Sequence, residues 1–363
     1  MQHKEARIIR LILSTNSLVK KGLLAGIIVI FLLSAYAIYW MLIVREVEQE
    51  LNQWALENQV EGVGFNFRSM EFSGFPFTLS LKLEGVTIGI NSSKLDNWSW
   101  NIHEIKAWVS PWLPDHVWFD ASGKQELVIN SNEAEKRYTI TSAEIGGDIN
   151  FISDTQGFMN IRAGDLSIKR MGFNPSRIQR SDINLDWHFH RELDGATEPI
   201  KFRFQLKDMR LPDIWAQPFG TKLEIIELAG KLSGSLKQGP FMSTLEGWRD
   251  AGGTIEISDF VARYGPLDLK IKGTLALDKR MQPIGALVAR AEGYMDLVDA
   301  LVDTDLIRPG AGTAIKLALS IIAKRSENRP DYVKIPLTIQ NQRLSVSNFS
   351  LLRLPTLNWH PLQ

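Results

Sequence analysis

The sequence predicts a mainly β fold of the α+β class. We expect an N-terminal transmembrane helix, then an extended, curved antiparallel β-sheet with a C-terminal helical hairpin packed on it. Three observations support this. Residues 22–44 form an apolar run without a charge, alternating apolar and polar residues recur from residue 62 onward, and two helical patterns flank Pro309-Gly310.

The apolar run reads GLLAGIIVIFLLSAYAIYWMLIV. A helix of this length reaches about 34 Å, which is enough to cross a hydrocarbon core of about 30 Å. A signal peptide is the competing interpretation, because Ser34-Ala35-Tyr36-Ala37 resembles a cleavage site that would end at Ala37. The apolar run continues to Val44, which favours an uncleaved anchor.

Charges on the two sides of this run differ. The basic residues before it are Lys4, Arg7, Arg10, Lys20 and Lys21, and the acidic residues after it are Glu46, Glu48, Glu50 and Glu57. Basic residues stay in the cytoplasm, so residues 1–21 are predicted to form a cytoplasmic tail and the main body to face the periplasm. We therefore expect a single-pass protein of the inner membrane. Residues 45–61 contain no proline and predict a helical stalk.

From residue 62 the periodicity changes from helical to alternating. Five runs show the alternation most clearly, namely residues 77–83, 183–189, 200–206, 267–271 and 333–339. Each predicts a strand with one apolar and one polar face, and the short polar turns between them favour antiparallel pairing. Pro336 restricts the last of these strands to a sheet edge or a bulge.

Three helical segments interrupt the strands, near residues 242–251, 293–307 and 313–325. In the last one, Ile315, Ala318, Leu319 and Ile322 have the spacing of a single apolar helix face. A further interruption near residues 171–181 divides the body into a first β-rich half, residues 62–175, and a second, residues 176–363.

The composition argues against several classes of function. The 41 basic residues balance the 41 acidic ones, so no nucleic acid partner is expected. The absence of cysteine excludes disulfides, thiolate catalysis and cysteine-ligated metal sites. There is no G-x-S-x-G motif, phosphate-binding loop or dinucleotide-binding turn. We therefore expect neither an enzyme nor a cofactor.

One group of residues has the chemistry of a metal site. Asp186, His188 and His190 alternate along one predicted strand, so their side chains share a face and lie about 7 Å apart. Two imidazoles and a carboxylate can bind zinc or iron. The alternative is the ordinary solvated face of a strand, and this alternative is favoured because no further ligand stands out.

Tryptophan is concentrated between residues 98 and 118. Trp98, Trp100, Trp108 and Trp112 are candidates for contact with a membrane surface or a lipid headgroup, and the alternative is that they are half-buried in the sheet. Pro111 and Pro114 predict a stiff loop in the middle of this region.

Several short stretches stand out along the body, namely Gly74-Phe75-Pro76-Phe77, Trp112-Leu113-Pro114-Asp115-His116-Val117, Gly252-Gly253, Tyr264-Gly265-Pro266-Leu267, Gly273-Thr274-Leu275-Ala276-Leu277-Asp278 and Gln282-Pro283-Ile284-Gly285. In their order and spacing they resemble a bacterial family known as domain of unknown function 2125. The resemblance covers roughly residues 60–355 and implies a bacterial protein with an anchored, exported layout. It implies no activity, cofactor or functional residue.

Two functional hypotheses remain open, and both make the inner membrane bilayer a partner. In the first, an apolar face of the sheet forms a groove for a lipid or another apolar ligand, a layout that is similar to AsmA-like envelope proteins. The candidate lining residues are Leu79, Leu81, Leu83, Phe202, Phe204, Leu206, Leu269 and Ile271. In the second, the protein is a scaffold that binds other envelope proteins through its sheet edges or the tryptophan region.

Overall fold

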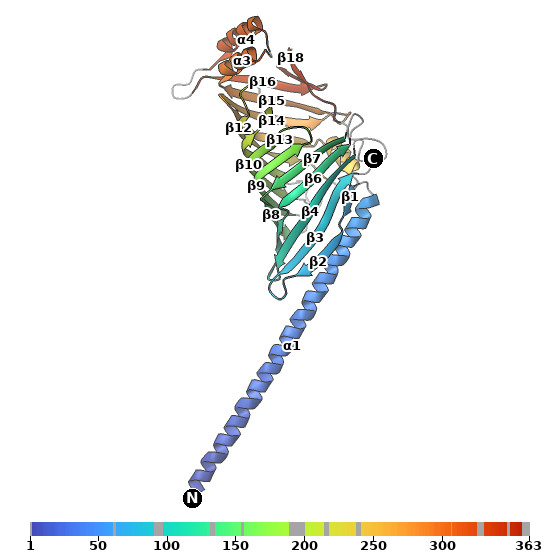
Figure 1. The fold of residues 1–363 in the computed structure, drawn as a ribbon, viewed down its shortest axis with the longest axis vertical. Coiled ribbons are helices and arrows are strands. Elements are labelled where there is room, and N and C mark those ends of the chain that lie inside the picture. The colour runs from blue at the N-terminus through green and yellow to red at the C-terminus, as the bar shows by residue number, and fades with distance from the viewer. Residues whose placement is uncertain are drawn as a thin grey trace.

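The computed structural model describes residues 2–60, 63–90, 97–130, 135–153, 156–188, 200–213, 218–236, 241–305, 307–324, 330–346 and 349–357. Within these ranges the chain forms four helices and one antiparallel sheet of 18 strands (Figure 1). This arrangement confirms the predicted fold class.

Helix α1 runs without interruption from Gln2 to Val60 and covers the predicted tail, apolar segment and stalk. Its segment Gly26–Gln53 is long and apolar enough to cross a membrane. The apolar side chains in the N-terminal part of this segment are left uncovered by the body, and Ile30 is 66% and Phe31 70% exposed. The N-terminal part of the helix projects away from the sheet (Figure 1).

The sheet is a meander in which consecutive strands lie beside one another. Its first half comprises β1 (Val63–Asn66), β2 (Ser69–Ser73), β3 (Leu79–Ile90), β4 (Asn97–Ser110), β5 (Leu113–Asp120), β6 (Gly123–Asn130), β7 (Glu135–Ser142), β8 (Glu144–Ser153) and β9 (Gln156–Arg170). The second half comprises β10 (Ser176–His188), β11 (Ile200–Arg210), β12 (Lys222–Ser233), β13 (Thr254–Tyr264), β14 (Leu267–Leu277), β15 (Pro283–Glu292), β16 (Tyr332–Gln340), β17 (Arg343–Val346) and β18 (Phe349–Arg353).

The first half departs from a simple meander at two places. Strands β1 and β2 both pair with β3, at its two ends. Strands β5 and β6 both pair with β4, and β7 and β8 both pair with β9, so each of these two pairs acts as one long strand with an interruption. Ser122 lies at the interruption between β5 and β6. Its hydroxyl accepts a hydrogen bond from the backbone N–H of Ile145 at 2.8 Å and donates one to Asp120 at 2.8 Å.

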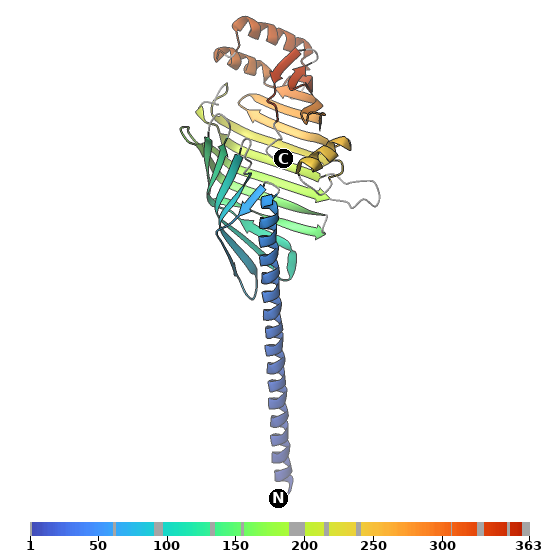
Figure 2. The same cartoon turned by 90° about the vertical axis from the view of Figure 1, so that its right-hand side faces the viewer.

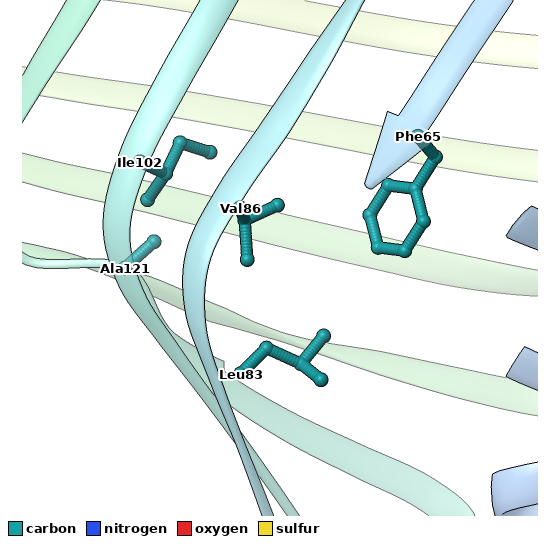
Figure 3. Packing of buried hydrophobic residues seen from close by; sticks show 5 residues of the cluster. All are labelled: Phe65, Leu83, Val86, Ile102 and Ala121. Carbon is teal, nitrogen blue, oxygen red and sulfur yellow. The ribbon is translucent and has the colours of Figure 1, made fainter. Parts of the chain in front are cut away.

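The sheet curls so that its first half faces its second half (Figures 1 and 2). Strands β9 and β10 pair from Ser176 opposite Ile168 to His188 opposite Gln156, so the sheet continues across residues 171–175. The C-terminal part of α1 lies beside β1, and Ala55 packs against a buried cluster of Phe65, Leu83, Val86, Ile102 and Ala121 (Figure 3). In this view, later strands cross behind the cluster.

Three short helices lie at the ends of the strands. Helix α2 (Phe241–Asp250) is held by Trp248, which is 1% exposed and donates a hydrogen bond from Nε1 to the carbonyl of Ser233 at 2.9 Å. Helices α3 (Tyr294–Asp303) and α4 (Pro309–Ile322) form the predicted hairpin. Gly312 of α4 lies against Val302 of α3, and Lys316 forms an ion pair with Asp299.

The buried face of α4 differs from the predicted one. Ile315 and Ile322, placed on the apolar face by their spacing, are 39% and 49% exposed. The helix instead turns Gly312 and Lys316 toward α3, because a residue without a side chain allows the two helices to approach closely. Apolar spacing therefore misidentified the contact face of this helix.

Two further predictions about strand ends were wrong, and one was confirmed. Phe77 belongs to a turn, because its backbone N–H donates to the carbonyl of Gly74 at 3.1 Å, and β3 begins only at Leu79. Pro114 lies within β5 and not in a loop. Pro336 sits opposite Val288 of β15, and β17 pairs with β16 only from Thr338 onward, so the proline is at an edge as predicted.

Candidate functional site

The most distinctive feature of the sheet is an apolar face that crosses it from β3 to β16. Residues directly opposite each other on paired strands point to the same face, so each row can be followed through the register. One row contains Leu81, Ala107, Phe119, Gly147, Ile161, Ile183, Phe204, Leu228, Phe260, Ile271, Ala289 and Ile335. We call the face that carries this row the inner face.

A second row on the inner face lies two residues away along the strands, or three on β13 where a β-bulge intervenes, and is equally apolar. It contains Leu79, Val109, Val117, Ile149, Met159, Leu185, Phe202, Gly230, Ile257, Gly273, Leu287 and Leu337. With neighbouring strands about 4.8 Å apart, each row is on the order of 50 Å long. The two rows make the inner face a continuous apolar band.

The band is well covered only at its two ends. Leu79 and Leu83 are buried at the end where α1 packs, and Leu287, Ala289 and Leu337 are buried in a second cluster at the other end. Between these ends the large side chains of both rows, from Val109 to Phe260, are only half-buried. A broad apolar surface of this kind is typical of a contact site.

Aromatic rings lie against glycines within the band. A Cβ atom placed on Gly230 would meet the ring of Phe202 at 2.7 Å, and one on Gly147 would meet the ring of Phe119 at 3.0 Å. The glycines therefore leave room for the rings of the neighbouring strand, which a side chain at either position would displace.

The opposite, outer face carries the polar residues of the same strands. Ion pairs connect neighbouring strands there, including Arg203 with Glu227 and Lys231 with Glu256 at 2.9 Å. Near β3, the hydrogen bonds that Lys82 donates to Glu84 and Glu104 raise the pKa of Lys82, and the bond from Lys82 lowers the pKa of Glu84. The outer face is therefore charged, in contrast to the apolar inner face.

A hollow of about 580 Å³ lies on the outer face over β9–β13. Its polar lining includes Asn184, Lys201 and Arg203. Asn184 donates a hydrogen bond to Asn160 at 2.9 Å, Arg203 pairs with Glu227, and Lys201 lies 3.9 Å from Asp186. Because these polar groups already have partners, the hollow is not our candidate site.

The structure places the predicted lining residues on one face of the sheet, in rows that cross many strands. Leu79 and Phe202 share the second row, and Leu81, Phe204 and Ile271 share the first. Leu206 and Leu269 lie in a third row, and Leu83 is part of the buried cluster beside α1. The sequence pattern did not identify β5, β8 and β9 as parts of the inner face, because glycine and polar residues interrupt the alternation of apolar residues in these strands.

The predicted metal ligands are only partly described. Asp186 is on the outer face, near Lys201. The backbone of His188 ends β10, while its side chain and all of His190 lie outside the described residues. Within the part of the chain that the structure describes, no group of three or more histidine, aspartate or glutamate side chains could hold a metal ion.

The four candidate tryptophans do not form one surface. Trp100 packs against the buried cluster of the inner face and donates a hydrogen bond to Gln125 at 2.9 Å, and Trp98 lies two residues before it on the same side of β4. Trp108 is opposite Trp118 on the outer face. Trp112 lies in the turn between β4 and β5 and is 62% exposed.

Comparison with known proteins gives one match. The family model described as "Uncharacterized protein conserved in bacteria (DUF2125)" matches residues 40–355, which include most of the sheet and the end of α1. No curated protein and no solved structure matches the chain.

Proposed function

The chain belongs to this uncharacterised bacterial family, and on that premise we propose that it is a membrane-anchored protein whose inner face binds an acyl chain or a similar elongated apolar ligand. In this proposal α1 spans the inner membrane with the N-terminus in the cytoplasm and the sheet in the periplasm. The basic residues before the apolar segment and the acidic residues after it support this orientation.

The observation that carries the proposal is the continuous apolar band. Its length and its half-buried middle suit a long, narrow, apolar ligand more than a compact one. Each 100 Å² of this surface that a ligand covers would contribute about 2.5 kcal/mol. The band contains no charged residue in either of its two main rows, so recognition would depend on the apolar part of the ligand.

A second candidate function is a scaffold for other envelope proteins. One observation favours it: α4 exposes Leu317 at 65% and Ile321 at 77%, at the opposite end of the body from the N-terminal part of α1 (Figure 1). Exposed apolar side chains on a helix are typical of protein contacts. The two functions are compatible, because they use different surfaces.

Native mass spectrometry of the full chain, extracted in a mild detergent, tests the first proposal. We expect lipid to be retained by the natural protein and by Arg203→Gln, and to be lost from Phe204→Gln. The two substitutions introduce the same residue on neighbouring positions of β11, one on each face of the sheet. Equal lipid content in both variants, or none in the natural protein, would contradict binding on the inner face.

A further inference from the structure

The turn between β2 and β3 makes a close contact with α1. We call residues Gly74–Thr78 the hairpin tip. The ring of Phe75 lies 5.9 Å from that of Tyr36 and 5.6 Å from that of Trp40, measured between centroids, and the Tyr36 hydroxyl donates a hydrogen bond to the carbonyl of Pro76. The hairpin tip is therefore held at the level of Tyr36–Trp40 along the helix.

This level lies within the apolar run of α1. Only 14 residues of the run, Gly22–Ala35, precede Tyr36. A helix of this length covers about 21 Å, whereas the hydrocarbon core is about 30 Å thick. To span the full thickness of the hydrocarbon core, the membrane-embedded part of α1 must therefore include roughly 9 Å, or about six residues, beyond Ala35. The hairpin tip then lies below the membrane surface.

We propose that the hairpin tip inserts into the leaflet nearer the sheet and contacts lipid acyl chains beside α1. This inference rests on the proposed function in one respect, namely that α1 spans the membrane. It adds a second, β-hairpin contact with the bilayer, at the edge of the sheet where both rows of the inner face begin with Leu79 and Leu81.

The composition of the hairpin tip fits this environment. Residues 72–81 contain no charged side chain, and Phe75 and Phe77 are 50% and 69% exposed. Each unpaired backbone polar group would cost several kcal/mol inside a bilayer. The carbonyl of Gly74 accepts hydrogen bonds from the N–H groups of Phe77 at 3.1 Å and Thr78 at 2.9 Å. Proline has no N–H, and Tyr36 satisfies the carbonyl of Pro76.

The neighbouring turn of the sheet lies at the same level. Because Val109 of β4 is opposite Leu79 of β3, the turn that follows β4 extends alongside the hairpin tip. It exposes Trp112 at 62% and Leu113 at 57%. An exposed tryptophan and leucine at this level suit the outer boundary of the hydrocarbon core, where indole rings are enriched.

Site-directed fluorescence can test the insertion, because the chain has no cysteine. Single variants Phe77→Cys, Tyr39→Cys and Met171→Cys would carry an environment-sensitive label in the full chain, reconstituted in phosphatidylcholine vesicles with or without doxyl-labelled lipid. Tyr39 is an exposed position of α1, and Met171, 81% exposed, lies in the turn between β9 and β10 at the opposite ends of the strands.

We expect lipid quenching at 77 to match that at 39 and to be absent at 171. Quenching at 39 together with aqueous iodide quenching at 77, as at 171, would overturn the insertion while leaving the anchor intact. Aqueous exposure at 39 would overturn both the anchor and the insertion. Because the side chain of Phe77 is exposed, its replacement should not disturb the fold. An unchanged circular dichroism spectrum of the variant would check this.

Discussion

The hydroxyl of Tyr36 on α1 donates a hydrogen bond to the backbone carbonyl of Pro76 in the hairpin tip. It connects positions 40 residues apart and ties the apolar segment of the helix to the edge of the sheet. Together with the packing of Ala55 on the buried cluster, it gives α1 two separate points of contact with the body. The sheet is therefore attached to α1 at its first strands, and both rows of the inner face begin there, on β3.

Removing the hydroxyl should loosen the hairpin tip without unfolding the sheet. Tyr36→Phe keeps the ring contact with Phe75 but loses a hydrogen bond worth about 1 kcal/mol. We expect faster amide hydrogen exchange at Phe77 and Thr78 in the reconstituted protein. Tyr39→Phe, on an exposed part of the same helix, is the control and should leave this exchange unchanged. Equal exchange in both variants would show that the hydrogen bond does not hold the tip.

A side chain at Gly230 should disturb the middle of the inner face. In Gly230→Val the new Cβ would lie 2.3 Å from the carbonyl oxygen of Glu256 and 2.7 Å from the ring of Phe202. We expect a loss of about 1–3 kcal/mol in the free energy of unfolding, measured by urea denaturation. Gly247→Ala in α2, where nothing lies within 4 Å, should instead be neutral or stabilising. A stable Gly230→Val protein would contradict the described packing.

Trp248 should be the most costly side chain to truncate at the end of the sheet near α2. It is 1% exposed, it donates a hydrogen bond to the carbonyl of Ser233, and its ring lies against Gly253. We expect Trp248→Ala to lower the free energy of unfolding by about 3–5 kcal/mol. Met171→Ala, at an 81% exposed position, should change it little. The comparison can be made by thermal denaturation.

Stability should fall in acid partly because of the carboxylates around Lys82. Hydrogen bonds from Lys82 lower the pKa of Glu84, and those from Lys106 and Lys82 lower the pKa of Glu104. A carboxylate with a lowered pKa in the folded state stabilises the protein at pH values above its ordinary pKa of 4.5. This contribution to the free energy of unfolding is lost as the pH falls through the folded-state pKa. The raised pKa of Lys82 corresponds to a stabilisation of the folded state that is present at neutral pH and is lost only in strong alkali.

The test is urea denaturation of Lys82→Gln at several pH values. We expect this variant to be less stable than the natural protein at pH 6 and the difference to shrink as pH falls below about 4. Lys124→Gln, at an exposed lysine of β6, is the control and should not change the pH dependence. A pH-independent difference for Lys82→Gln would contradict the role of these ion pairs.

Individual elements of this fold could be predicted from sequence because their periodicity is local. Alternation along residues 200–206 and 267–271 predicts strands with a correct apolar face, and Pro336 predicts an edge position. The end of a strand is harder to predict. Phe77 continues the alternation of Leu79 and Leu81, yet hydrogen bonds to Gly74 close the turn before β3 begins.

The candidate site could not be assembled from the sequence, because it depends on the order and register of the whole meander. Gly147 and Gly230 look like weak points in a strand, but in the structure they lie beneath aromatic rings of the neighbouring strand. The tryptophans cluster in sequence, yet Trp100 and Trp108 lie on opposite faces of β4, because the strand changes its alternation between Ile102 and Ile105 opposite Gly85. The contact between Tyr36 and Pro76 carries no sequence signal that we can identify.

Site-specific photocrosslinking in living cells tests the central claim most directly. Benzoylphenylalanine would replace Phe204 on the inner face, Arg203 on the outer face, or Ile30 in the exposed apolar part of α1 as a positive control. After irradiation and digestion, we predict a lipid adduct by mass spectrometry at 204 and 30 and none at 203. A lipid adduct at 30 without one at 204 would contradict lipid binding by the inner face.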